Sequence, residues 1–289
     1  MISASLVKEL REKSGAGMMD CKVALENSKG DLEEALNYLR EKGIAKATKK
    51  ASRIASEGLA NIYVDGNKAV ILEINSETDF VSKNDEFKNM FDVIGKALLE
   101  SNAKTLEEAN KLKTEEGTIE EYIVNKTAKI GEKLSFRRFE LISKSDDEVF
   151  GPYIHMGGKI AVLTLLKGAT EEVAKDVSMQ AAAMRPKYIF SKDVPAEELE
   201  QEKEILKTQA MEEGKPADIA AKMVEGRIKK FYQEICLADQ AFIKDGGLSV
   251  NNYVTNNGGE IVNVIRYEVG EGLEKRNEDF ASEVMNQIK

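Results

Sequence analysis

The spacing of the apolar residues changes at Gly58, and this change most restricts how the chain can fold. Before Gly58, apolar residues recur every three or four positions, which is the spacing of amphipathic helices. After it, residues 60–64 and 69–74 form two strand-like segments around a turn that contains Asp-Gly, a pattern typical of a β-hairpin. A helical pattern follows, and residues 134–141 alternate again as a third strand. We therefore predict an α+β fold.

The same order of segments occurs a second time further along the chain. Residues 149–155 and 159–166 form a second predicted hairpin, and Thr170 is placed to cap a helix. In the final strand, residues 261–269, the sequence Ile-Arg-Tyr-Glu-Val echoes the Arg-Arg-Phe-Glu-Leu of the first unit. We interpret this as duplication of a hairpin–helix–strand subdomain, which requires the same strand order in both halves. The two predicted subdomains cover residues 58–142 and 143–269.

A charged helical insertion interrupts the second unit at about residues 195–233. One helix leads to a turn at residues 213–216, and another runs back with a narrow apolar seam. We expect an antiparallel helical hairpin that projects from the core. The sequence leaves open whether the hairpin pairs with itself, giving a dimer or higher assembly, or with a partner. Residues 270–289 begin with glycines and carry the thin apolar stripe of a C-terminal helix.

Residues 1–45 carry the pattern of three short helices, with Ser5 as a candidate cap of the first and Asp31 of the third. Three short helices can bury only a small core. We therefore expect a docking module of marginal independent stability. Neighbouring residues on a helix point to different faces. We therefore expect one of Met18 and Met19 to face outward, with partial burial of both as the alternative.

Residues 46–57 form a basic linker that contains Lys46, Lys49, Lys50 and Arg53. A basic segment can bind nucleic acid. The whole chain, however, has a net charge of −9 and a pI of about 5.1, whereas nucleic-acid binding needs a positive surface. We therefore favour a solvated, partly helical linker and predict no direct contact with nucleic acid.

The residue inventory excludes most catalytic and metal chemistry. His155 is the only histidine, and Cys21 and Cys236 are too far apart in sequence to form a metal-ligand motif. We expect both cysteines to be free and buried, in a reducing compartment. The chain has no phosphate-loop or dinucleotide motif, no secretory apolar segment and no apolar run of membrane-spanning length. We predict a cytoplasmic protein that is not an enzyme, has no cofactor or metal and does not bind membranes.

Residues 75–84 link the first hairpin to the next helix and are unusual for a loop. The aromatic Phe80 lies beside the carboxylate Asp79, with no glycine or proline to form a tight turn. Loops commonly carry function, and an exposed aromatic side chain needs a partner to cover it. In the alternative interpretation, Phe80 packs back under the following helix, which Asp79 or Asn84 caps. Glu77 is the nearest acidic residue that a catalytic role for Asp79 would use.

Two motifs resemble the signatures of the elongation factor Ts family. Residues 10–25, LREKSGAGMMDCKVAL, are similar to its N-terminal signature, with Ser14 where the family commonly has threonine. Residues 78–81, TDFV, are similar to its second signature. The resemblance implies a guanine-nucleotide exchange factor that acts on elongation factor Tu, in its GDP-bound and nucleotide-free forms. It also implies a ubiquitin-associated-like module at residues 1–45, a coiled-coil arm used in assembly, and a C-terminal module at residues 270–289 that contacts the same partner.

The resemblance also assigns roles to individual residues. It implies that the loop at residues 78–81 displaces Mg²⁺ from the partner's nucleotide site, and that the turn after the second hairpin approaches the partner's phosphate loop. Met156 in that turn is bulkier than the small residue expected there. The loop residues are Thr78, Asp79, Phe80 and Val81, the turn residues are His155, Met156 and Gly157, and the N-terminal contacts are Lys8, Arg11, Met18 and Met19. The alternative function is a scaffold that holds elongation factor Tu without driving exchange.

Overall fold

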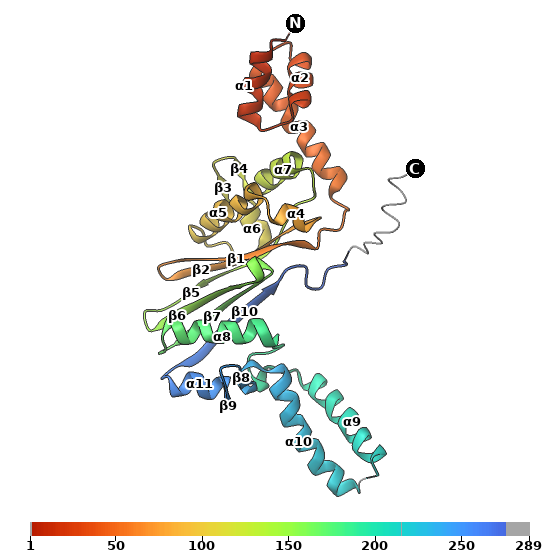
Figure 1. Cartoon of the computed structure of the whole chain (residues 1–289), viewed down its shortest axis with the longest axis vertical. Helices are drawn as coiled ribbons and strands as arrows, with labels where there is room; N and C mark the ends of the chain where they lie inside the picture. The colour runs from red at the N-terminus through yellow and green to blue at the C-terminus, as the bar shows by residue number, and fades with distance from the viewer. Residues whose placement is uncertain (1, 215, 276–289) are drawn as a thin grey trace.

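Two small antiparallel sheets form the centre of the molecule (Figure 1). The computed structural model describes residues 2–214 and 216–275. The first sheet has the strand order β1-β2-β5, and the second has the order β6-β7-β10. In each sheet the second strand of a hairpin is central and a later strand pairs with its free edge, so both halves have the order that a duplication requires. The strands are β1 (Glu57–Asp65), β2 (Lys68–Ser76), β5 (Ser135–Ser143), β6 (Glu148–His155), β7 (Ile160–Lys167) and β10 (Glu260–Glu268).

The two sheets pack face to face, and one apolar cluster contains residues of both. Its buried members are Ala60, Ala69, Ile71, Phe150, Ala161, Leu163, Leu165, Ile265 and Tyr267. The central strands β2 and β7 are consequently buried on both faces, which explains why their sequences are almost continuously apolar. The combination of helices with small antiparallel sheets agrees with the predicted α+β class.

Helices cover the outer face of each sheet, so the core has four layers (Figure 1). On the first sheet lie α5 (Asp85–Leu99) and α7 (Ile119–Ile130), whose apolar faces share a cluster with β2. On the second lie α8 (Glu171–Met184) and α11 (Val250–Asn256). Thr170 accepts a hydrogen bond from the first turn of α8, which confirms its predicted capping role.

A short segment between α5 and α7 departs from the purely helical pattern that the sequence predicted there. It contains α6 (Leu106–Asn110) and a small hairpin of β3 (Lys113–Thr114) and β4 (Gly117–Thr118). Strands of two residues are too short to show an alternation of apolar and polar positions, so this hairpin could not be predicted from the pattern.

The N-terminal helices have a core of their own, built on Leu10, Cys21, Ala24, Leu25 and Ala35. The helices are α1 (Ala4–Ser14), α2 (Met18–Asn27) and α3 (Leu32–Lys50). Asp31 caps α3 as predicted, but Ser3 rather than Ser5 caps α1, because the helix begins two residues earlier than its apolar pattern. Helix α3 also runs through the boundary predicted at residue 45, so all three lysines of the basic linker are helical.

The predicted insertion is formed by α9 (Ala196–Glu212) and α10 (Ala217–Ile235), which pack side by side and project from the core (Figure 1). The remaining short elements are η1 (Met156–Gly158), η2 (Ser191–Asp193), η3 (Leu237–Asp239), β8 (Ala241–Phe242) and β9 (Asp245–Ser249). Both cysteines are free and buried, as predicted. The predicted C-terminal helix falls at residues 276–289, outside the described residues. Among the described helices, none combines the length and apolarity needed to cross a membrane.

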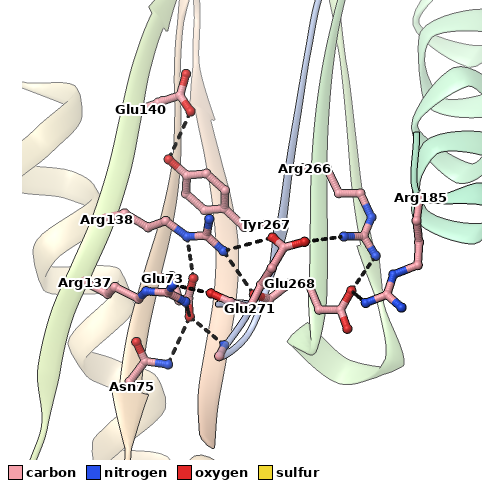
Figure 2. A network of polar contacts seen from close by, with 11 residues as sticks. Glu73, Asn75, Arg137, Arg138, Glu140, Arg185, Arg266, Tyr267, Glu268 and Glu271 are labelled. Carbon is pink, nitrogen blue, oxygen red and sulfur yellow. Dashed lines mark hydrogen bonds and ion pairs between the residues drawn. The ribbon is translucent and has the colours of Figure 1, made fainter. Parts of the chain in front are cut away.

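A buried carboxylate ties the first sheet to the end of β10 (Figure 2). Glu73 on β2 is fully buried and pairs with Arg137 at 2.9 Å and Arg138 at 2.6 Å, both on β5. It also accepts hydrogen bonds from the Asn75 side chain and from the backbone N–H of Gly270. A buried charge is tolerated only when it is paired and hydrogen-bonded, and here the pairing fixes the path of the chain after β10.

Candidate partner-binding surface

The loop at residues 75–84 presents Phe80 to solvent. Residues 79–82 form one helical turn, α4 (Asp79–Ser82), in which Val81 and Ser82 are buried while the Phe80 side chain is 79% exposed. The interpretation in which Phe80 packs under α5 is therefore wrong. Asn84 does cap α5, by accepting a hydrogen bond from the Glu86 N–H. The turn thus keeps an aromatic ring in water without using it to support the next helix.

Two acidic side chains hold the base of this loop. Glu132 accepts hydrogen bonds from the N–H of Thr78 at 2.9 Å and from its hydroxyl at 2.7 Å. Glu77 accepts a hydrogen bond from the Lys133 N–H at 2.6 Å and pairs with Arg53 at 3.2 Å. Because Glu77 is committed to these groups, it is not available as the acid–base partner that a catalytic role for Asp79 would need. The clamp formed by Glu77 and Glu132 fixes where Phe80 projects.

Asp79 keeps its charge. Its carboxylate accepts a hydrogen bond from Lys83 at 2.7 Å, and this bond holds the pKa of Asp79 below its usual range. Lys159, which lies on the second half of the chain, lowers the same pKa through its charge. At neutral pH the loop therefore presents an aromatic ring and an ionised carboxylate side by side.

The turn between β6 and β7 presents a second exposed apolar side chain. Met156 is 71% exposed and, like Gly157 and Gly158 after it, has a positive φ. His155 is half-buried, and its Nδ1 lies 3.0 Å from the Tyr153 hydroxyl. A Cβ on Gly158 would lie 3.1 Å from Leu59 of β1, so a glycine is needed for this close approach. The turn is tied to the first sheet through this contact.

The two exposed loops both lie beside the same strand, β1. Both α4 and η1 contact β1, and Lys159 next to the turn pairs with Glu57 at the start of β1 at 2.5 Å. The structure therefore brings together Asp79, Phe80 and Met156, which are far apart in the sequence. It brings them together through β1, an element that contributes no candidate residue itself.

The N-terminal candidates are exposed as well, and one of them shares a groove with Phe80. Met18 is 60% exposed and Met19 69% exposed, so both face outward, where we expected one to do so; the alternative, partial burial of both, is wrong. Arg11 and Phe80 line one open groove of about 510 Å³, together with the loop that joins α1 to α2. Lys8 and the His155 turn are not among its lining residues, and Lys8 pairs with Glu12 at 3.8 Å.

Sequence reasoning found the exposed residues but missed the groups that position them. Glu132 follows the end of α7 and is separated from Thr78 by a whole helical region, so no local pattern relates the two. Lys159 was likewise seen only as the start of a strand. Within residues 2–214 and 216–275, no three His, Cys, Asp or Glu side chains come close enough to hold a metal ion.

One comparison with known proteins bears on this surface. A family model described as Elongation factor TS matches residues 77–271 of the chain. The match begins at the clamp residue Glu77 and includes the exposed loop, the His155 turn and both sheets apart from β1 and β2. The three N-terminal helices lie outside it.

Proposed function

The chain belongs to the elongation factor Ts family, and from this premise we propose that it binds elongation factor Tu carrying GDP and accelerates release of the nucleotide. Membership of this family gives it a role in translation elongation. In the proposed role it is an exchange factor rather than an enzyme, because it uses binding energy to change the affinity of its partner and makes or breaks no covalent bond.

The observation that carries the proposal is the exposure of Phe80 on a clamped turn. Covering an exposed phenylalanine ring with a protein surface gains about 2–3 kcal/mol. An exchange factor has to apply such energy to weakening the hold of its partner on GDP, and each tenfold loss of GDP affinity requires about 1.4 kcal/mol of coupling. Since Glu132 and Glu77 fix the loop, the partner rather than Phe80 has to move when the ring is inserted.

Asp79 gives the same loop an electrostatic action. GDP is held in such partners by backbone amides and by Mg²⁺, which is bound through phosphate and protein oxygens. We propose that the ionised Asp79 disturbs the groups that support this Mg²⁺ while Phe80 separates the elements that carry them. Thr78 and Val81 act as the fixed flanks, since Thr78 is bonded to Glu132 and Val81 is buried.

The other candidate residues extend the proposed contact. We propose that His155, Met156 and Gly157 approach the phosphate-binding side of the partner, because their turn lies beside the Phe80 loop. We propose that Lys8, Arg11, Met18 and Met19 of the ubiquitin-associated-like module contact its nucleotide domain, and the groove shared by Arg11 and Phe80 supports this placement. The pair of helices α9 and α10 acts in this proposal as a coiled-coil arm for assembly.

The decisive experiment measures release of a fluorescent GDP analogue from elongation factor Tu, with and without this protein, across Mg²⁺ concentrations. We expect a large acceleration that shrinks when Mg²⁺ is removed beforehand. The matched control is Val64→Ala, because Val64 is also an exposed apolar residue but lies at the opposite end of the β1–β2 hairpin from Phe80. Binding without acceleration would contradict exchange and would instead identify a scaffold.

A further inference from the structure

Within the described part of the chain, the N-terminal helices and the core have separate apolar clusters. The buried residues of α1, α2 and α3 form one cluster, and those of the first sheet with α5 and α7 form another. The two are connected by helix α3, which runs past the end of its own module and packs against α7 (Figure 1). This helix pair is the main contact that orients the module on the core.

Gly43 lies at a close approach between α3 and α7. Gly43 is buried in the middle of α3, and a Cβ placed on it would lie 3.3 Å from the Cβ of Ala128 on α7. Glycine weakens the interior of a helix relative to alanine, since it gains no side-chain contact and loses more backbone freedom on folding. Its presence here permits an approach of the two helices that a larger residue would prevent.

Polar contacts surround this close approach. Arg40 of α3 pairs with Glu121 of α7, and the Lys50 ammonium donates a hydrogen bond to the Gly131 carbonyl at the end of α7. The α1–α2 loop also rests against the core, because a Cβ on Gly15 would lie 2.9 Å from the Lys129 side chain. These groups are exposed at the surface, where ion pairs contribute little to stability. We therefore expect them to orient α3 about its axis rather than to supply much of the energy that binds it to α7.

We propose that Gly43 is a positioning residue, which docks α3 on Ala128 so that Arg11, Met18 and Met19 are held at a fixed spacing from Phe80. This inference rests on the proposed function, because it explains how two separate cores present one surface to a single partner. Two contacts on a rigid body bind a partner more tightly than the same two contacts joined by a flexible linker. On the rigid body, the second contact forms without a further loss of conformational entropy.

The first test measures the free protein and needs no partner. Spin labels on Glu26→Cys and Lys104→Cys, both exposed positions, report the distance between the module and the core. Gly43→Leu is expected to lengthen and broaden the distance distribution. The matched control is Gly226→Leu in α10, because Gly226 is also a helical glycine but has no atom within 4 Å of an added Cβ. An unchanged distribution in Gly43→Leu would overturn the proposal.

The second test separates positioning from a general loss of structure. In the wild-type background, Met18→Ala with Met19→Ala is expected to weaken binding of elongation factor Tu by about tenfold, as removal of interface anchors does. In the Gly43→Leu background the same pair should have almost no further effect, while Phe80→Ala should keep its full effect. If the methionine substitutions remain fully additive with Gly43→Leu, the positioning role is wrong.

A compensating variant covers the case in which Gly43→Leu fails to fold. Gly43→Ala crowds Ala128, and Ala128→Gly in the same chain removes the crowding, so the pair should recover the wild-type distance and affinity. No recovery would contradict the proposed contact. If the wild-type protein does not bind elongation factor Tu at all, the proposed function fails, and the distance measurement still decides whether Gly43 docks the module.

Discussion

The Phe80 loop and the Met156 turn solve the same problem in different ways. Each keeps a large apolar side chain in water, with 79% of Phe80 and 71% of Met156 exposed. The Phe80 loop does so with helical backbone angles and a clamp of side chains from elsewhere in the chain. The Met156 turn does so with its own backbone, in which three successive residues have positive φ. The direction of Phe80 therefore depends on distant side chains, whereas that of Met156 depends chiefly on the backbone of its own turn and on the contact of that turn with β1.

The largest expected effect comes from removing the exposed ring. Phe80→Ala should leave the thermal unfolding temperature almost unchanged, because the ring contributes little buried area to the free protein. It should slow GDP release at saturating factor by about 30-fold, which corresponds to the roughly 2 kcal/mol that an anchor residue contributes at an interface. Stopped-flow release of a fluorescent GDP analogue measures the rate, with Val64→Ala as the control. A rate within twofold of wild type would remove Phe80 from the mechanism.

The second effect tests the clamp. Glu132→Ala frees both the N–H and the hydroxyl of Thr78, and we expect exchange to slow by about fivefold as the loop loses its fixed position, because pre-organisation is lost while the ring remains. Thr78→Val removes only the hydroxyl bond and should have a smaller effect. The double variant should be no slower than Glu132→Ala alone, since both act on one contact. Independent, additive effects would show that the clamp does not act through Thr78.

The two loops also show which features could be predicted from the sequence and which could not. The hairpins, the caps formed by Thr170 and Asn84, and the exposed Phe80 follow from local patterns of one or two turns, and each was predicted or named as one of two alternatives. The clamp through Glu132 was not predictable, because it joins two residues that only the fold brings together. The same holds for Glu73, whose charge inside an apolar strand is explained only by two arginines on β5.

The packing of whole helices and strands against one another could not be predicted from the sequence either. The sequence of a strand does not show whether its sheet packs on helices alone or also on a second sheet. The almost continuous apolar residues of β2 and β7 indicate burial on both faces, but not which elements cover each face. The linker was predicted to be partly helical, but the end of α3 at Lys50 was not predictable, because basic residues without an apolar stripe look like a solvated linker. The stripe is absent because the contact on α7 is made by Gly43, which has no side chain.

The third effect tests the backbone of the turn. Gly157→Ala and Gly66→Ala both place a side chain at positive φ with open space around it, so both should lower the free energy of unfolding by about 1 kcal/mol. Only Gly157→Ala should also slow exchange, by about threefold, because it shifts the direction in which Met156 and His155 project. Chemical denaturation and the nucleotide-release assay give the two quantities. Equal exchange rates in both variants would make the turn a structural feature only.

The smallest effect is expected for His155, and its dependence on Mg²⁺ separates the two loops. His155 is half-buried and bonded to Tyr153, so His155→Ala removes less exposed surface than Phe80→Ala and should slow exchange by only about twofold. If the Phe80 loop acts on the metal, the defect of Phe80→Ala should shrink once Mg²⁺ is removed from the partner. The defect of His155→Ala should persist, because its turn acts on the phosphate-binding side. If both defects persist equally without Mg²⁺, the two loops act on the same element of the partner. They would then differ only in how the protein holds each of them in place.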